Sequence, residues 1–420
     1  MPEQDLPQLD HLVRTFEPYC NLWKICGDFT NHLPEWTDGP FTELDPESLT
    51  NSIENWIRAL AKVQKVLSER AAEACKILNE RLNKFQEYLP LIAALRNPGL
   101  RERHWKRMSK DLGFPVKVDV SFSLSRALQL QLLEHMEVIE EISEYASKEY
   151  SLEKTLDKMQ HEWSGVNFDR MDWRETGTTI LRGIDDIQAI LDDQVVKTQA
   201  MRASPYIGAL EERVKLWEKR LNNVQETIDE WLKCQQQWLY LEPIFGSDDI
   251  MQQMPNEGRK FKTVDATWKK TMEKVEKNSE VLTVCSDDEL LKNLIDANKL
   301  LDAVQKGLND YLETKRLAFP RFYFLSNEEL LEILSETKDP LRVQPFLKKI
   351  FEGISKIKFE DDLTVTAMIS AEGESVQLVN TFNPNSAGGN VERWLIDLEA
   401  CMRESVKHVT KKSFDAYANT

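Results

Sequence analysis

The segment 207–231, IGALEERVKLWEKRLNNVQETIDEW, decides the fold class, because its large apolar residues recur at alternating steps of three and four. This spacing is a seven-residue repeat, which places all of these side chains along one seam of an α-helix. Gln235 interrupts the repeat and Trp238 restores it. Such a seam must pack on another helix. The seam residues are Ile207, Leu210, Val214, Trp217, Leu221, Val224, Ile228 and Trp231.

A second repeat of the same kind occupies residues 290–311, and Ser286-Asp287-Asp288-Glu289 before it has the form of a capping box. Another capping box, Ser326-Asn327-Glu328-Glu329, predicts the start of a short helix. We expect the two seams to bury each other within one chain. The predicted fold is therefore mainly α, an elongated, monomeric bundle of long antiparallel helices. The second repeat consists of Leu290, Leu294, Ala297, Leu301, Val304, Leu308 and Tyr311.

Helical patterns also precede the first seam. Asp45-Pro46 has the residues of a helix start, and the apolar stripe that follows predicts one helix of up to about 44 residues, ending at Pro90. A second helical region runs from about Ser123 to Trp163, with a break or bend where the stripe slips near Tyr150. Five prolines before residue 45 predict only short elements there: Pro2, Pro7, Pro18, Pro34 and Pro40.

Two segments alternate apolar and polar residues, as β-strands do. Residues 166–181, around Gly177, and residues 363–379, around Glu372-Gly373-Glu374, therefore predict small β-hairpin insertions. A final helix is expected from Val391 to about Val409. The predicted parts are a lead-in of short elements (1–44), an N-terminal helical part (45–205), a central helical part (206–326) and a C-terminal helical part with a hairpin (327–420).

Composition narrows the possible functions. The chain has 15 glycines and 16 prolines among 420 residues, which is few for a globular protein and favours long elements. Its net charge of −17 disfavours nucleic-acid and anionic-membrane partners and favours neutral or basic ones. The amino terminus lacks the pattern of a secretory signal, and no apolar run is long enough to span a membrane. We expect a soluble intracellular protein.

The sequence contains no pattern for catalytic, cofactor-binding or metal-binding residues. No glycine is followed by lysine, so a phosphate-binding loop is missing, and we expect neither nucleotide binding nor hydrolysis. The six cysteines and six histidines show no metal-binding spacing, which favours buried, reduced thiols. The basic stretch 101–110 allows two interpretations: a surface for an acidic partner, or a solvated helix face, which the pattern favours.

Longer motifs carry a family resemblance. Residues 319–334 read FPRFYFLSNEELLEIL after YLETKR, and RERHW (101–105), LDDQVVKTQAMRASPY (191–206) and WLYLEPIF (238–245) precede them in order. With these motifs the chain resembles the linker region, N-terminal region 2, of dynein heavy chains. The residues of these motifs resemble those of axonemal members more closely than those of cytoplasmic members. The signature residues are Phe319, Pro320, Arg321, Phe322, Tyr323, Phe324 and Leu325.

The resemblance implies a mechanical linker that joins the tail to the ring of AAA ATPase modules and changes shape with the nucleotide cycle to drive minus-end-directed movement on microtubules. It implies a non-catalytic fragment whose partners are the ring of its own heavy chain and, through the adjoining tail, intermediate and light chains. Microtubules would be contacted only by missing parts. The implied location is the cytoplasm and cytoskeleton, in the ciliary axoneme. The periodicity alone also fits a static helical scaffold or spectrin-like tether, but no repeat of about a hundred residues is present.

A linker that changes shape needs a place where helix continuity fails, and the sequence offers two. In ASPYIG, residues 203–208, Pro205 disfavours helical geometry at Ser204 just before the long seam. The other segment, 242–258, contains two prolines and two glycines. We favour the first, so the candidate hinge residues are Ser204, Pro205 and Gly208.

Overall fold

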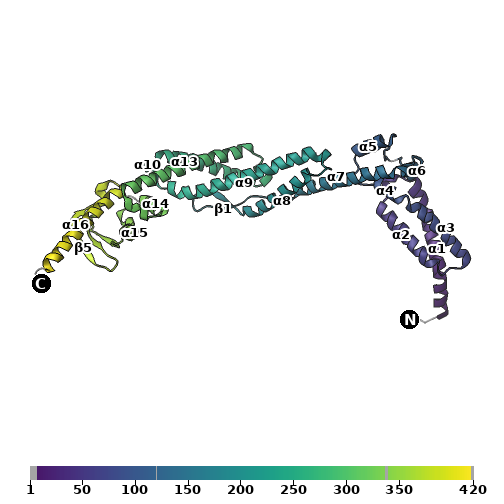
Figure 1. The fold of residues 1–420 in the computed structure, drawn as a ribbon, viewed down its shortest axis with the longest axis horizontal. Helices are drawn as coiled ribbons and strands as arrows, with labels where there is room; N and C mark the ends of the chain where they lie inside the picture. Colours follow the sequence, from purple (N-terminus) through teal and green to yellow (C-terminus); the bar gives the residue numbers. More distant parts are fainter. Residues whose placement is uncertain (1–6, 120, 336–338, 418–420) are drawn as a thin grey trace. The chain divides into compact units, whose positions relative to one another are not determined.

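The computed structural model describes residues 7–119, 121–335 and 339–417 (Figure 1). It divides into two compact units. The first consists of Met1–Glu162 and Lys197–Leu216, and the second of Trp163–Val196 and Trp217–Thr420. Both units are mainly helical, and the second also contains two small antiparallel sheets, which confirms the predicted fold class. The predicted part boundaries at residues 205 and 326 stay predictions.

The first unit begins with a long helix, α1 (Pro7–Asp38), so the prediction of short elements before residue 45 is wrong. Pro18 and Pro34 lie inside this helix, and each costs about 3 kcal/mol through its missing N–H and steric clash. Leu22, Ile25 and Phe29 are buried on one face of α1, each worth about 1.5–3 kcal/mol. Their burial offsets the cost of the two prolines. Pro2 lies outside the described residues.

The expected single helix after Asp45 is two helices, α2 (Pro46–Val63) and α3 (Glu69–Gln86), which pack on each other. Asp45 caps α2 as predicted, because its side chain accepts a hydrogen bond from the Glu47 N–H at 3.1 Å. The chain turns back at residues 64–68, where Ser68 is extended. The segment contains neither glycine nor proline, so the apolar stripe continues across the turn and hides it.

The helical region from Ser123 is also divided, but not near Tyr150. Gln131 has a positive φ of 55° and separates α6 (Leu124–Gln129) from the 3₁₀ turn η2 (Leu132–His135) and α7 (Met136–Glu162), which runs unbroken past Tyr150. The stripe slips at Glu149 because this buried residue makes polar contacts instead of apolar ones. The remaining elements here are η1 (Phe41–Glu43), α4 (Leu89–Leu95) and α5 (Glu102–Leu112).

In the second unit, β1 (Asp169–Asp172) and β2 (Thr179–Arg182) form the first predicted hairpin, with Asp172 opposite Thr179. Gly177 lies in the turn between the two strands and has a φ of 70°, a backbone conformation that residues other than glycine rarely adopt. The helix α8 (Ile184–Arg202) follows and contributes to both units.

The seam helices form the centre of the second unit. The first seam lies on α9 (Glu211–Phe245), which also contributes to both units, and the second on α13 (Asp288–Ala318). The helices α9 and α13 lie side by side (Figure 1). Lys233 and Gln237 of α9 contact Asp302 of α13. Between them in sequence, α11 (Pro255–Lys277) packs on both. The seam residues from Leu210 to Trp231 and from Leu290 to Leu308 are buried, while Ile207 and Tyr311 are half-buried.

The helix directions follow from the paired residues. Trp238 stacks on Trp268 and Phe245 on Phe261, so α11 runs antiparallel to α9. It is also antiparallel to α13, because Lys274 near its end pairs with Asp287 at the start of α13. The two seam helices therefore run parallel to each other, with α11 as the antiparallel element that the sequence pattern did not identify.

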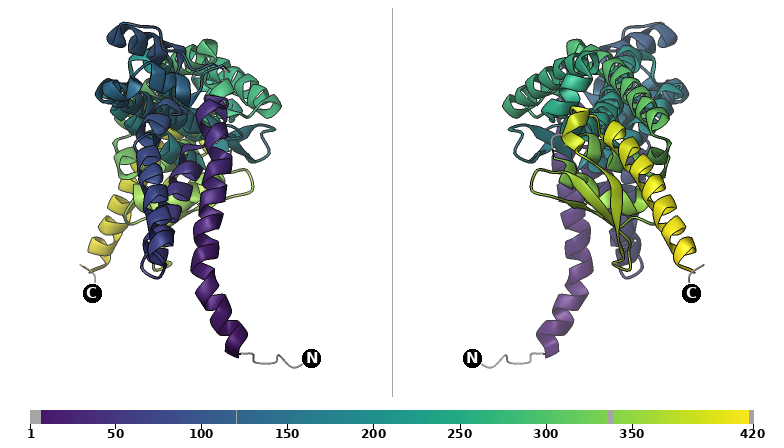
Figure 2. Two further views of the ribbon diagram at one scale, coloured as in Figure 1. Left: turned by 90° about the vertical axis from the view of Figure 1, so that its right-hand side faces the viewer. Right: turned by 90° about the vertical axis from the view of Figure 1, so that its left-hand side faces the viewer.

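The remaining elements complete the second unit. Asp287, not Ser286, caps α13, whereas Ser326 and Glu329 form the predicted reciprocal capping box of α14 (Asn327–Ser335). The second predicted hairpin is part of a three-stranded antiparallel sheet with the strand order β3-β4-β5. The helix α16 packs along β5 (Figure 2). These elements are β3 (Lys356–Phe359), β4 (Val365–Ile369), β5 (Ser375–Phe382), α16 (Val391–Tyr417), α10 (Asp248–Gln253), α12 (Val281–Val284), α15 (Leu347–Ile350), η4 (Pro320–Phe324), η5 (Pro340–Phe346) and η6 (Pro384–Ala387).

Gln235, which interrupts the first seam, is buried against the hairpin. Its side-chain oxygen accepts the Leu181 N–H at 2.8 Å, and its amide donates to the Leu181 carbonyl at 3.0 Å. The side chain thus satisfies both backbone groups of one residue of β2. It attaches the hairpin to α9.

We expect Gln235→Leu to lower the free energy of unfolding by about 2–3 kcal/mol, because it leaves the Leu181 N–H and carbonyl buried without partners. Urea denaturation would measure the loss. The exposed neighbour Gln236→Leu is the matched control and should change stability little. Equal effects of the two substitutions would contradict this role for Gln235.

Among the described residues, no helix combines the length and the apolar character needed to cross a membrane.

Candidate functional site: the hinge segment and the signature segment

The candidate hinge lies in the first unit, between the end of α8 at Arg202 and the 3₁₀ turn η3 (Gly208–Leu210). The helix stops before Pro205, as predicted. Two weaker turns replace the helical ladder: the Ser204 N–H donates to the Met201 carbonyl at 3.1 Å, and the Ile207 N–H donates to the Ser204 carbonyl at 3.3 Å. The segment is therefore an irregular connection between two long helices.

Tyr206 holds the hinge segment against α7. Its ring meets that of Tyr145 edge-on, with centroids 5.2 Å apart. The Lys148 ammonium lies 5.0 Å from the Tyr206 ring centroid and donates to its hydroxyl at 3.3 Å. The hydrogen bond to Glu144 raises the pKa of Lys148, and the hydrogen bond to Tyr206 raises it to a smaller extent. Gly208 is not sterically required, since an added Cβ would make only an ordinary contact with the Tyr145 hydroxyl at 3.7 Å.

The second hinge candidate, residues 242–258, is a packed corner. Here α9 ends at Phe245, α10 follows, and Pro255 starts α11. The Met251 side chain of α10 packs against Gly258 of α11, where an added Cβ would lie 2.7 Å from the methionine sulfur. Close packing resists bending, whereas Pro205 in the other segment is exposed. The comparison favours Ser204, Pro205 and Gly208, whose role as a hinge stays a prediction.

The signature segment 319–325 has one buried and one exposed side. Phe319, Phe322 and Leu325 are buried, and the first two rings meet edge-on at 5.0 Å. Tyr323 and Phe324 face outward, with exposed fractions of 53% and 68%. The sequence suggested the importance of the segment but not this division.

Arginines and an ion pair join the signature segment to its neighbours. The Arg321 guanidinium lies over the Phe351 ring at 5.0 Å and 3.5 Å from the Glu399 carboxylate on α16. A largely buried pair, Lys315 with Glu392 at 2.6 Å, joins the end of α13 to the start of α16. The segment is thus a structural junction between α13, the region of α15 and α16. Sequence reasoning identified neither ion pair.

The basic stretch 101–110 is largely paired within the first unit. Arg101 and Arg107 contact Glu153 and Glu141 of α7, and Arg103 forms an ion pair with the buried Glu149. The sequence analysis interpreted this stretch either as a surface for an acidic partner or as a solvated helix face. Neither interpretation included the carboxylates of α7. The one signal in the sequence was the slip of the apolar stripe near Tyr150, next to Glu149.

His104 lies buried among these charges. Its Nδ1 accepts the Arg101 N–H at 3.0 Å, and its Nε2 lies 3.4 Å from Glu149. Burial, followed by the nearby charges of Arg103, Arg107 and Arg101, lowers the pKa of His104. The ring is therefore kept neutral in the folded protein.

A lowered pKa makes His104 a source of acid sensitivity. The unfolded chain takes up the proton near the ordinary histidine pKa of about 6.5, while the folded chain resists it, so the stabilising contribution is present above that pH and is lost as the pH falls below it. His104→Asn retains an acceptor for the Arg101 N–H but cannot titrate. We expect the variant to lose less stability than wild type between pH 7.5 and 5 in urea denaturation. Parallel losses would contradict this.

Other reactive groups show no catalytic arrangement in the parts of the chain that the structure describes. Cys75, Cys234 and Cys285 are buried free thiols, and burial raises the pKa of Cys234 and Cys285 to about 12. They are therefore protonated at neutral pH. No cluster of three or more histidine, cysteine, aspartate or glutamate side chains able to hold a metal ion occurs within the described residues.

The fold and these segments describe a mainly helical protein of long packed helices. Residues 9–413 match the family model of the dynein heavy chain, N-terminal region 2, and the chain belongs to this family. It is 43% identical over 419 residues to dynein axonemal heavy chain 1 of Mus musculus, 45% over 416 residues to dynein axonemal heavy chain 3 of Homo sapiens, and 46% over 421 residues to dynein axonemal heavy chain 12 of Rattus norvegicus. The resemblance that the motifs indicated is confirmed.

These alignments cover 98–99% of this chain but only 10%, 10% and 14% of the three relatives. The chain therefore spans only about a tenth of the length of the relatives that it matches. The activity of a whole heavy chain does not transfer to it directly.

Proposed function

We propose that this chain is the linker of an axonemal dynein, a mechanical element that joins the tail to the AAA ring of the same heavy chain. The observation that carries the proposal is the family match over residues 9–413, together with the 43–46% identity to axonemal heavy chains. The linker changes shape during the nucleotide cycle and so drives movement along microtubules. It works in the axoneme of the cilium and contributes no catalysis itself.

Features of the molecule support a mechanical role. The packed seams, with their large buried aromatic residues, make the second unit resist deformation, because close-packed interiors transmit strain. The Lys315–Glu392 pair and the Arg321 contacts join successive elements through buried or half-buried groups, which would carry load from one element to the next. Neither feature distinguishes a moving linker from a static tether, so the test must measure motion.

The test uses a complete heavy chain in which this chain occupies its natural position. Residues 9–413 are deleted, and the motor is attached to a surface through a tag on its AAA ring. We expect ATP hydrolysis to persist while gliding of microtubules is lost, because the ring then lacks its lever. A static tether would be dispensable in this geometry, so unchanged gliding velocity would contradict the proposal and favour the scaffold alternative.

A further inference from the structure

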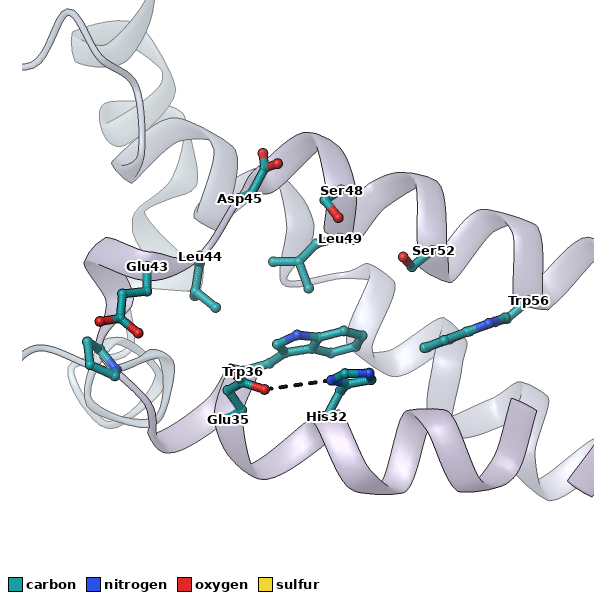
Figure 3. A pocket seen from close by; sticks show the side chains of 11 residues that line it. His32, Glu35, Trp36, Glu43, Leu44, Asp45, Ser48, Leu49, Ser52 and Trp56 are labelled. Carbon is teal, nitrogen blue, oxygen red and sulfur yellow. Dashed lines mark ion pairs between the residues drawn. The ribbon is translucent and has the colours of Figure 1, made fainter. Parts of the chain in front are cut away.

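A cavity of about 330 Å³ lies between α1 and α2 in the first unit (Figure 3). Its size is at the lower end of small-ligand sites. His32, Glu35 and Trp36 project from α1, Trp56 and two serines project from α2, and Glu43 and Asp45 come from the segment that joins the two helices (Figure 3). The residues that matter here are His32, Trp36, Trp56, Glu35, Glu43 and Asp45.

The aromatic rings that line the cavity are held in place by their neighbours. Trp36 and Trp56 are stacked, with centroids 6.0 Å apart and planes at 25°, and His32 stacks on Trp36 at 5.5 Å and 9°. Phe85 packs on Trp36 at 5.4 Å and Phe29 meets Trp56 edge-on at 6.3 Å. The aromatic faces are thus in place before any ligand arrives.

The carboxylates leave the cavity with an excess of negative charge. One oxygen of Asp45 accepts the Glu47 N–H that caps α2, and Glu35 lies 3.6 Å from His32, a pair that is ionic only when the histidine is protonated. Glu43 is exposed and has no basic partner within the described part of the chain. Of the residues that line the cavity, His32 alone can carry positive charge.

We propose that this cavity binds an arginine side chain of a partner polypeptide. A guanidinium is planar and weakly hydrated, so it stacks on an indole face by cation–π attraction while its N–H groups donate to carboxylates. Lysine offers a more strongly hydrated point charge without the planar match. Phosphate-bearing ligands would be repelled by the three carboxylates. The site is independent of the proposed linker function.

The test uses residues 1–420 with the indole nitrogens of tryptophan labelled with ¹⁵N, and two peptide probes at pH 8. One probe is acetyl-Gly-Arg-Gly-amide, and the other replaces arginine with citrulline, a neutral analogue of nearly the same shape. We expect the arginine probe to shift the indole N–H signals of Trp36 and Trp56 saturably, with the citrulline probe binding at least about fivefold more weakly. Equal binding of both probes would overturn the proposal.

Variants locate the site without disturbing the core. Glu43→Gln removes one exposed carboxylate of the cavity and should weaken the arginine probe up to about fivefold, the range of exposed charge pairs. Glu47→Gln, at another exposed glutamate that lies on α2 outside the cavity lining, is the matched control and should leave the affinity unchanged. Asp45 is left intact because it caps α2. Equal weakening by the two variants, or shifts confined to other tryptophans, would show that the cavity does not bind the probe.

Discussion

Trp231→Ala is expected to lower the free energy of unfolding of the second unit by about 3–5 kcal/mol, the usual cost of emptying a large aromatic site in a core. The Trp231 side chain is fully buried in the first seam and packs on Phe168 with ring centroids 5.4 Å apart. Removing it would leave a cavity between α9 and the segment that leads into the hairpin. Trp217, also buried in this seam, should show a similar loss on substitution by alanine.

A second substitution separates packing from polarity at this site. The Trp231 indole N–H is buried without a hydrogen-bond partner in the described structure, which costs stability. Trp231→Phe removes that N–H while keeping most of the ring, so its loss should be about 1 kcal/mol or less. Trp23→Ala, at a side chain that is 65% exposed, serves as the surface control and should change stability by less than about 0.5 kcal/mol.

Because the chain has two units, unfolding need not be a single transition. Hydrogen exchange of the α9 amides reports on the second unit directly and should be combined with urea denaturation. If Trp231→Ala unfolded like the Trp23→Ala control, the assignment of this tryptophan to the core of the second unit would be wrong.

The parts of the fold that the sequence predicted best are those where one physical rule dominates. A seven-residue repeat buried on one side explains α9 and α13, and strict alternation explains both hairpins. The pattern could not show that the two seam helices run parallel, because direction depends on α11, whose apolar residues are compatible with several partners. Nor could it show the turn at residues 64–68, which lacks glycine and proline.

Polar residues inside apolar patterns explain the remaining errors. Gln235 was identified only as an interruption of the first seam, and the slip near Tyr150 was interpreted as a break or bend. In the structure, Gln235 and Glu149 at these places each make a buried contact to another element. Their partners, a strand backbone and an arginine on α5, are distant in sequence, so spacing alone cannot identify them. The helix α1 was missed for the opposite reason: proline was treated as a strict stop, although burial of three large side chains offsets its cost.

The candidate site was predicted only in part. Pro205 correctly marked the end of a helix, but the clamp of Tyr206 by Tyr145 and Lys148 depends on α7, about sixty residues earlier. The signature segment was recognised from its amino-acid sequence. Its role as a junction is shown only by its contacts in the structure, such as that of Arg321 with Glu399 on α16. A motif identifies a family more readily than it explains which contacts the motif makes.

Locking the hinge segment is expected to stop movement while leaving ATP hydrolysis intact, if the linker bends at residues 204–208. The experiment rests on the proposed function and uses the complete heavy chain. Cysteines replace Ala203 and Ala209, both exposed and on opposite sides of Pro205, and a short cleavable bismaleimide joins them. The link fixes the distance between the end of α8 and the start of α9, so a change of angle there is prevented. Gliding velocity should fall to near zero and recover when the link is cleaved.

A matched control places the same cross-link where no bending is expected. Lys215 and Lys219 are exposed and lie one turn apart on α9, so cysteines at these positions are joined within a rigid helix. This link should leave gliding unchanged, which accounts for any effect of the reagent on the native cysteines. If gliding continued at full velocity with the 203–209 link verified as closed by mass spectrometry, the hinge would lie elsewhere. Residues 242–258 would then be the next segment to lock, although the contact of Gly258 with Met251 opposes bending there.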